Sequence, residues 1–289
     1  MPGRRDRERM MITEQATKTD GAPMPAGLSV RLEDVTVTFP AAGAPLEALS
    51  GLTVDIPADS LTVIIGPNGC GKSTLLRLIA GLVAPTSGQV ELGERGAPRA
   101  GDGRVGLAFQ QPRLVPWLST LDNVALPPAL AGVPAAERRE QAMAALERVG
   151  LAEASGVRPA QLSGGMAQRA GLARALISDP PVLLLDEPFS ALDALTREGF
   201  DGELQRLWMD RPRTLVLVTH SVSEAVRMAD RIVVMTARPG SVARVILVDL
   251  SRPRPAALAA DPAAAAIDAS VRAALAEVHP AELTPWVDR

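Results

Sequence analysis

The chain has 289 residues, of which 47% are hydrophobic, and a formal net charge of −3 with acidic and basic residues interspersed. This length allows one large domain or two small ones with a sizeable core. The charge argues against the basic surface of a protein that binds duplex nucleic acid, so nucleic acid is not an expected partner. The one cysteine, Cys70, cannot form an internal disulfide and indicates a reducing compartment. No apolar run reaches the ~18–20 residues of a membrane-spanning helix.

The N-terminal part of the chain predicts a leader followed by strands and a helix. Residues 1–27 are polar and lack periodicity, and we expect them to form a flexible leader. The segment "VRLEDVTVTF" (30–39) alternates as a half-buried strand does, and "GLTVDI" (51–56) and "LTVII" (61–65) follow as further strands. The segment "KSTLLRLIAGL" (72–82) has the spacing of a helix and ends at a glycine.

The rest of the chain alternates helices with buried strands, which implies a mainly parallel sheet. A segment from about 112 to 175 departs from this rhythm, because it is helical and contains prolines, and we expect it to be an inserted helical subdomain. Residues 251–289 are expected to be an Ala-rich extension with helical potential and little bulk to bury. Further helices are predicted at 135–151 and 166–177, and further strands within 181–188, 214–219 and 231–235.

A phosphate-binding loop is the most specific motif in the sequence. In "VIIGPNGCGKSTLL", Gly66, Gly71, Lys72 and Ser73 match the loop pattern between a strand and a helix, which is the context that the pattern requires. We expect Lys72 to reach the β- and γ-phosphates and Ser73 to offer its hydroxyl to Mg²⁺. Backbone amides would point at the phosphates. The residues expected to bind the nucleotide here are Gly66, Pro67, Asn68, Gly69, Cys70, Gly71, Lys72, Ser73 and Thr74.

Cys70 has two readings within this loop. It either fills a small position, or it lies close enough to bound phosphate for a nucleotide to shield its thiol from alkylation. Protection of the thiol by nucleotide would distinguish the two.

Two carboxylates and a histidine follow apolar strands. Asp186 and Glu187 come at the end of "VLLLDEP", where the ligands of open α/β sheets bind. Asp186 suits Mg²⁺, directly or through water, and Glu187 can orient and polarise an attacking water. His220 follows the strand "TLVLVT", whose end we expect on the same side of the sheet. His279 lies in the Ala-rich tail and is expected to be an ordinary surface residue.

The stretch "QLSGGMAQR" (161–169) places a permissive turn before a helix. Ser163 can cap that helix, and the free N–H groups at the start of a helix attract anions. Taken alone, this pattern is also typical of an ordinary helix cap.

The ordered motifs "GPNGCGKST", "FQQPRLVPW", "LSGGM", "LLLDEP", "SALD" and "VTH" resemble the ATPase subunit of an ATP-binding cassette transporter over residues 28–250. The resemblance implies a P-loop NTPase core with a mainly parallel sheet, an antiparallel β subdomain and an inserted helical subdomain. It also implies ATP hydrolysis with Mg²⁺. Two copies would associate head to tail, so that Ser163, Gly164, Gly165 and Met166 of one face ATP on the other.

Further residue roles are implied by the resemblance alone. Gln110 matches the glutamine that joins the magnesium site to the transporter contact, with Gln111 as an alternative register. Asp193 matches a residue that signals across the dimer interface. His220 matches the switch histidine that contacts the γ-phosphate and helps hold the attacking water. Phe39 occupies the region of the aromatic residue that stacks on adenine, or it is a core residue at a strand end.

One residue departs from the most frequent signature. Met166 stands where that signature has glutamine, which puts a side-chain hydrogen bond in doubt but leaves the backbone contacts. We expect ATP hydrolysis to survive this change.

Two segments resemble the importer group for nitrate, sulfonate, taurine and bicarbonate, namely "FQQPRLVPWLSTLDNVALP" and "MTARPGSVARVILVDLSRPR". This resemblance implies a peripheral subunit at the cytoplasmic face of the membrane. Its partners would be a second copy, transmembrane permease subunits and, indirectly, a periplasmic or extracellular solute-binding protein. Trp117 either lies near the docking site of a membrane subunit or packs ordinarily. The alternatives are the ATPase of an exporter or a lipoprotein-extraction system, and a cytosolic cassette ATPase without a transport role.

Overall fold

Two β-sheets organise the computed structural model, which describes residues 27–41, 43–188, 194–255, 258 and 260–278. One sheet has three antiparallel strands in the order β2-β1-β4, and the other has six strands in the order β5-β6-β7-β3-β8-β9. The six-stranded sheet is parallel except for the antiparallel pair β8 and β9. The strands are β1 Val30–Phe39, β2 Leu46–Ile56, β3 Leu61–Ile65, β4 Ser87–Leu92, β5 Val105–Ala108, β6 Val182–Asp186, β7 Thr214–Val218, β8 Arg231–Met235 and β9 Val242–Leu247.

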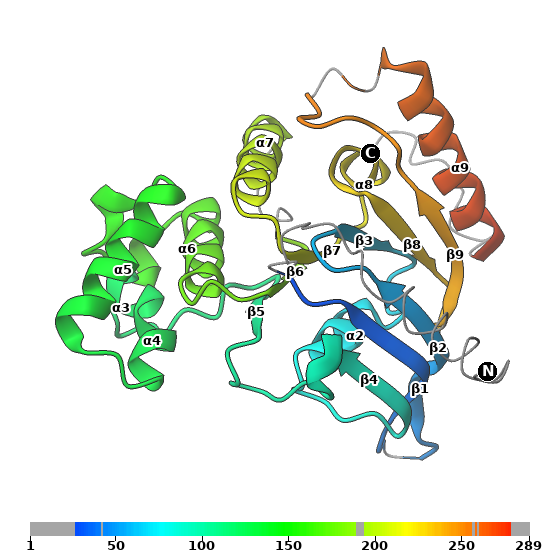
Figure 1. Cartoon of the computed structure of the whole chain (residues 1–289), viewed down its shortest axis with the longest axis horizontal. Helices are drawn as coiled ribbons and strands as arrows, with labels where there is room; N and C mark the ends of the chain where they lie inside the picture. Colours follow the sequence, from blue (N-terminus) through cyan, green and yellow to red (C-terminus); the bar gives the residue numbers. More distant parts are fainter. Residues whose placement is uncertain (1–26, 42, 189–193, 256–257, 259, 279–289) are drawn as a thin grey trace, which may run out of the picture.

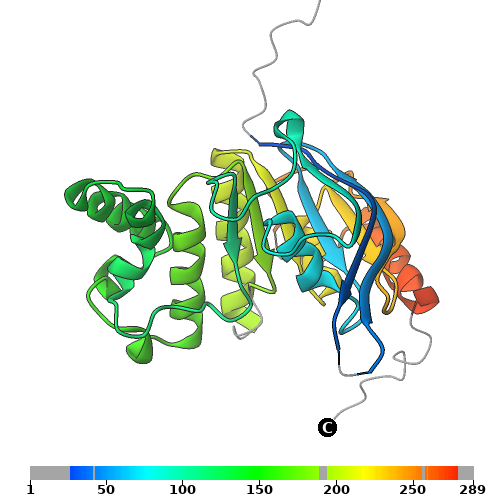
Figure 2. The ribbon, with the colours of Figure 1, turned by 90° about the horizontal axis from the view of Figure 1, so that it is seen from below.

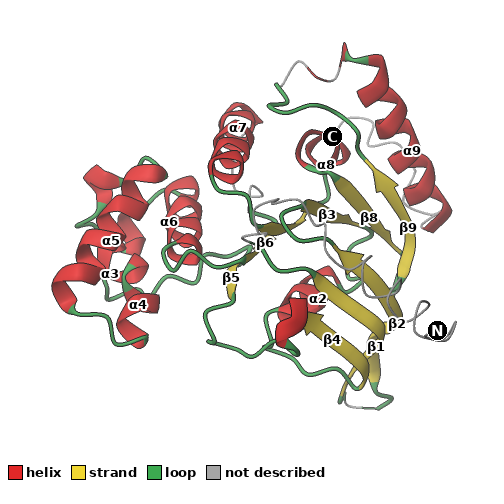
Figure 3. Ribbon diagram, viewed as in Figure 1, coloured by secondary structure: helices red, strands yellow, loops and turns green. Residues whose placement is uncertain are grey.

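The six-stranded sheet separates two apolar cores. Every residue of β3, β6 and β7 is buried, as expected for a parallel sheet that is covered on both faces. Side chains alternate along each strand, so Val63 belongs to one core and Ile64 to the other. Helix α2 (Lys72–Ile79) lies on one side of the sheet, while α7 (Ala194–Asp210), α8 (Val222–Met228) and α9 (Pro262–Val278) lie on the other (Figure 3). The α/β fold predicted from the sequence is confirmed.

The sequence pattern predicts some of the described helices and misses α7 and α8. Helices α2, α5 and α6 lie where the sequence pattern predicts helices. The α-helices are α2 Lys72–Ile79, α3 Thr120–Val124, α4 Leu126–Leu130, α5 Ala135–Arg148, α6 Gly164–Leu176, α7 Ala194–Asp210, α8 Val222–Met228 and α9 Pro262–Val278, and the short 3₁₀ helices are Gly93–Arg95, Ala152–Ala154 and Pro159–Gln161. None of the described helices is both long enough and apolar enough to cross a membrane.

Helices α3 to α6 gather at one end of the molecule, away from the antiparallel sheet (Figures 1 and 2). Helices α3, α5 and α6 pack on one another, and α6 also contacts β5. This arrangement supports an inserted helical subdomain at about 112–175, although its limits stay a prediction.

The antiparallel sheet holds the clearest difference from the sequence pattern. Strand β2 begins at Leu46, five residues before the predicted start at Gly51. Gly51 has a φ of 53°, and the pairing of β1 with β2 shifts its register on both sides of that point. This irregularity interrupts the alternation by which the first half of β2 could have been recognised.

The C-terminal helix α9 covers the outer part of the larger sheet (Figure 1). It packs on β8, β9 and α8, and it buries Ala264, Val271 and Ala274. The helical potential predicted for this region is therefore confirmed. Small alanine side chains let the helix approach the sheet closely, so this extension contributes to the core despite its low bulk.

Candidate functional site

One edge of the larger sheet collects most of the predicted site residues. Strands β5, β6, β7 and β3 are neighbours and run parallel, so their carboxyl ends lie along the same edge. In strand order, the segments after these ends carry Gln110, the pair Asp186 and Glu187, His220, and the loop that begins at Gly66. Ligands of open α/β sheets bind at this edge. A cavity of about 920 Å³ opens there.

The predicted phosphate loop is a tight connection between β3 and α2. Gly71 has a φ of 103° and is the N-cap of α2. A Cβ atom on Gly71 would lie 2.7 Å from Leu49 Cδ2 and 2.8 Å from the Ala48 carbonyl oxygen, so this position requires glycine. The first N–H groups of α2 have no acceptor within the helix, which suits an anion. The loop residues that line the cavity are Gly66, Pro67, Asn68, Gly69, Gly71, Lys72, Ser73 and Thr74.

Lys72 lies within this loop and is only 6% exposed. Its ammonium donates hydrogen bonds to the carbonyl oxygens of Gly66 at 2.8 Å and Pro67 at 2.9 Å. These bonds hold the positive charge at the centre of the loop. An anion bound by the loop amides would meet it there.

The Cys70 side chain packs in the core that contains Met235, and its sulfur lies 3.9 Å from Lys72 Nζ. It is completely buried, and Cys70 is not among the residues that line the cavity. Burial raises the pKa of the Cys70 thiol. The reading in which Cys70 fills a small position agrees with the structure. The fold itself, and not a nucleotide, shields the thiol from solvent.

Ser73 and Asp186 join α2 to β6. The Ser73 hydroxyl donates to Asp186 Oδ1 at 3.2 Å. Burial raises the pKa of the Asp186 carboxyl, and the hydrogen bond from Ser73 opposes that rise. Hydroxyl and carboxylate oxygens are the ligands that Mg²⁺ prefers, so this pair fits the predicted magnesium site.

The three residues predicted to be catalytic meet at one carboxylate oxygen. Gln110 Nε2 donates to Glu187 Oε2 at 2.8 Å, and His220 Nδ1 lies 3.7 Å from the same oxygen. Glu187 has a φ of 45°, which is uncommon for a residue other than glycine and concentrates at functional sites. The Glu187 backbone N–H donates to the Val218 carbonyl at 3.0 Å, which ties the residue to β7.

The opposite end of the cavity includes residues that no motif indicates. Phe39, at the end of β1, lines this end of the cavity, and the stacking of its ring on adenine stays a prediction. It is joined there by Leu46 and Ala48 of β2, Arg238 between β8 and β9, and Leu275 of α9. These segments are far apart in the sequence. A short turn-forming run, "RPGS", is the signal nearest to Arg238.

The predicted signature lies elsewhere on the surface. Ser163 is the N-cap of α6, and its hydroxyl accepts from the Met166 N–H at 3.2 Å. Ser163 and Gly164 are exposed, and Gly165 and Met166 are half-buried. None of these four described residues lines the cavity, so one chain does not join its own signature to its own phosphate loop. Asp193 lies outside the described residues.

Similarity to known proteins agrees with this site. Residues 49–190 match the family model described as ABC transporter. An uncharacterized ABC transporter ATP-binding protein of Methanocaldococcus jannaschii is 43% identical over 227 residues, covering 78% of this chain and 85% of that protein. The aliphatic sulfonates import ATP-binding protein SsuB 1 of Mesorhizobium japonicum is 48% identical over 207 residues, covering 71% and 76%. The taurine import ATP-binding protein TauB of Chromobacterium violaceum is 46% identical over 219 residues, covering 75% and 82%.

A solved structure is similar in fold as well as in sequence. It is the dimeric post-hydrolysis state of an ATP-binding cassette bound to ADP and Pi, with a TM-score of 0.69 and 33% identity over 77% of this chain and 100% of that chain. The phosphate loop, the carboxylates at the sheet edge and these relatives lead to the same conclusion. The chain belongs to the ABC transporter family, as one of its ATP-binding, ATP-hydrolysing subunits.

Proposed function

We propose that the chain drives an importer whose solute is nitrate, a sulfonate, taurine or a related small anion. Relatives named as sulfonate and taurine import ATP-binding proteins are 46–49% identical to it, which supports this solute class. The subunit would lie at the cytoplasmic face of the membrane, bound to transmembrane permease subunits. A solute-binding protein on the other side would deliver the anion.

The observation that carries the mechanism is the division of the site. The cavity contains the phosphate loop, Glu187 and His220, whereas the Ser163 turn is exposed and lies outside it. A head-to-tail dimer would place Ser163 of each copy against ATP held by the other, adding N–H groups at the start of a helix. The similar solved cassette is a dimer. Each copy would thus complete the site of its partner.

Each residue of the cavity then has a defined task. Lys72 and the loop amides bind the triphosphate, and Glu187 orients the attacking water and accepts its proton. Gln110 and His220 position the Glu187 carboxylate, since both approach its Oε2 atom, at 2.8 Å and 3.7 Å. Ser73, Asp186 and the amide oxygen of Gln110 would hold Mg²⁺. With Mg²⁺ bound, these residues would supply a site at which negative charge on the phosphates is neutralised.

ATP supplies contacts between the two faces of the dimer and therefore favours the closed form. Closure would move the permease subunits, and hydrolysis would remove the linking contacts so that the dimer reopens. A monomer should bind ATP but hydrolyse it poorly.

The composite site can be tested by mixing two inactive variants. Lys72→Ala damages the phosphate loop, and Ser163→Arg damages the signature, so each variant alone should lose ATPase activity. A mixed dimer has one site with an intact loop from the Ser163→Arg copy and an intact signature from the Lys72→Ala copy. Mixing should therefore restore part of the activity, and restoration should require concentrations at which dimers form. Full turnover by a dilute wild-type monomer, or no restoration in a demonstrated mixed dimer, would contradict the proposal.

The solute class needs a separate test. Uptake of radiolabelled taurine, an alkanesulfonate and nitrate is compared in cells with the wild-type chain and with Glu187→Gln. We expect uptake of one of these anions to require Glu187. Co-purification with a permease of exporter type, without any anion uptake, would favour export instead.

A further inference from the structure

The cavity has a second basic side chain at the end away from Glu187. Arg238, in the loop between β8 and β9, lines the cavity with its side chain exposed. Within the described part of the chain, no carboxylate or carbonyl oxygen pairs with its guanidinium. Lys72, by contrast, is buried and bonded to two loop carbonyls. The Arg238 guanidinium can therefore contact a ligand in this cavity.

The backbone beside Arg238 is fixed to the nucleotide-binding elements. The Gly240 N–H donates to the Ala48 carbonyl at 3.0 Å, and the Ser50 N–H donates to the Gly240 carbonyl at 3.0 Å. A Cβ atom on Gly240 would overlap the Cys70 carbonyl oxygen, so this loop lies directly against the phosphate loop. The two ends of the loop that carries Arg238 are also joined, since the Ser241 N–H donates to Thr236 Oγ1 at 2.9 Å. The position of Arg238 is thus built into the fold.

The strand order indicates which part of a nucleotide Arg238 would meet. Strand β3, which leads into the phosphate loop, lies between β7 and β8. Glu187 and His220 follow β6 and β7 on one side of it, and Arg238 follows β8 on the other. A nucleotide with its γ-phosphate near Glu187 and its triphosphate on the loop therefore extends toward β8 and β2. Its adenosine part would reach Arg238.

Helix α9 adds an apolar side chain to the same end. Leu275 lines the cavity, and the preceding Ala274 and nearby Val271 are buried against the core. The Arg244 guanidinium on β9 lies 3.1 Å from Glu277 Oε2, which adds a link between the sheet and the end of the helix. Leu275 is therefore held in place by the packing of α9.

We propose that Arg238 and Leu275 form a wall of the nucleotide site that contacts the adenosine part of ATP, so that α9 belongs to the binding site. The planar guanidinium stacks on the purine, and Leu275 covers its edge, while Phe39 and Leu46 bury the base from the β1–β2 side. The inference rests on the proposed function in one respect, namely that this cavity holds ATP.

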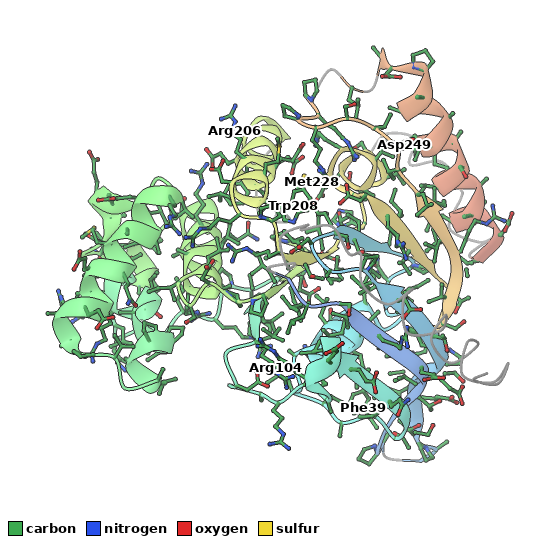
Figure 4. All side chains as sticks on the ribbon, in the orientation of Figure 1. Phe39, Arg104, Arg206, Trp208, Met228 and Asp249 are labelled. Atoms are coloured by element: carbon green, nitrogen blue, oxygen red, sulfur yellow. The ribbon has the colours of Figure 1, made fainter. Side chains whose placement is uncertain are left out.

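The test compares two ligands that differ in the adenosine part. Calorimetry on the full chain measures binding of Mg²⁺-ATP and of Mg²⁺ with inorganic triphosphate, for the wild type and for Arg238→Ala, Arg238→Lys and Leu275→Ala. Arg206→Ala is the matched control, because Arg206 is an exposed arginine on α7 that does not line the cavity (Figure 4). Thermal unfolding establishes that each variant is folded.

We expect Arg238→Ala to weaken ATP about tenfold, consistent with loss of a desolvated cation–π contact, and to leave inorganic triphosphate within about twofold. Arg238→Lys should recover only part of the ATP affinity, since lysine keeps the charge but lacks the plane. Leu275→Ala should weaken ATP by about threefold, the cost of roughly one buried methylene. Arg206→Ala should behave as the wild type.

Two results would overturn the inference. If folded Arg238→Ala bound ATP as tightly as the wild type does, Arg238 would make no contact with ATP that contributes to affinity. If Arg238→Ala weakened the binding of ATP and of inorganic triphosphate equally, Arg238 would attract anions in general and would not contact the adenosine part. If the wild-type chain bound neither ligand, the proposed function itself would fail. If the wild type bound ATP and Arg238→Ala bound it equally well, only the inference about Arg238 would fail, so the two failures are distinguishable.

Discussion

The two ends of the cavity are built in different ways. The phosphate end consists of short continuous segments that follow β3, β6 and β7, where the chemistry requires particular atoms at fixed places. The opposite end combines the ends of β1 and β2, the β8–β9 loop and Leu275 of α9. That end needs only apolar faces and one planar cation, which many residue combinations supply. Residues that must place particular atoms around the phosphates therefore occur in short sequence motifs. Residues that only surround the rest of the ligand come from segments far apart in the sequence.

The strongest test of the phosphate end is Glu187→Gln. The amide keeps the shape of the carboxylate but cannot accept the proton of the attacking water, so the rate of hydrolysis should fall by roughly 10²–10⁴-fold. ATP binding should persist, and gel filtration with ATP should show a trapped dimer. Turnover at the wild-type rate would mean that Glu187 is not the base.

A second substitution tests the junction where the phosphate loop meets β2. Gly71→Ala forces a side chain into the left-handed region and against Leu49 and the Ala48 carbonyl, so it should cost about 1–3 kcal/mol of unfolding free energy. Urea denaturation measures the loss. Gly69→Ala is the control, because Gly69 has a φ of 74° but no atom within 4 Å of an added Cβ. Equal losses in the two variants would show that the contact with β2 has no effect.

The opposite end is tested by Phe39→Leu, which keeps an apolar side chain but removes the aromatic face. We expect ATP affinity to fall by about 2- to 10-fold, the range of one aromatic stacking contact. Equilibrium binding and thermal unfolding are measured together. A lower melting temperature with unchanged affinity would identify Phe39 as a core residue only, which is the alternative reading of the sequence.

The smallest effect is expected at Cys70, which belongs to the loop in sequence but to the core in space. Cys70→Ala should leave ATP affinity within about twofold, because Cys70 does not line the cavity. In the wild type, the buried thiol with its raised pKa should react slowly with iodoacetamide, with or without ATP. Rapid alkylation that ATP prevents would contradict this placement.

The sequence predicts the parts of the fold that depend on short-range patterns. The parallel strands are continuous apolar runs, and the glycines of the phosphate loop follow from the backbone conformation that the loop requires. Strand β9 was not predicted. All six of its residues are half-buried or exposed, in an order that does not alternate. Strand β4, with the sequence SGQVEL, buries only two of its six residues, and β5 has only four residues, so neither stands out from the loops around it.

The site shows the same division between local and long-range information. Glu187 and His220 could be predicted because each directly follows an apolar strand, and parallel strands bring such residues to one edge. Arg238 and Leu275 could not be predicted, because their place at the cavity depends on how β9 and α9 pack on the sheet. The contact of Gly240 with the phosphate loop is likewise a product of tertiary packing.

Strand β6 ties the chemistry to both cores at once. Leu183 and Leu185 enter one core, while Val182 and Leu184 enter the other. A slip of one residue would exchange these side chains between the cores and carry Asp186 away from Ser73. A substitution that disturbs the apolar packing of β6 far from ATP would therefore also displace the Asp186 carboxylate. Slower ATP hydrolysis would be an early sign that the packing of the two cores had been disturbed.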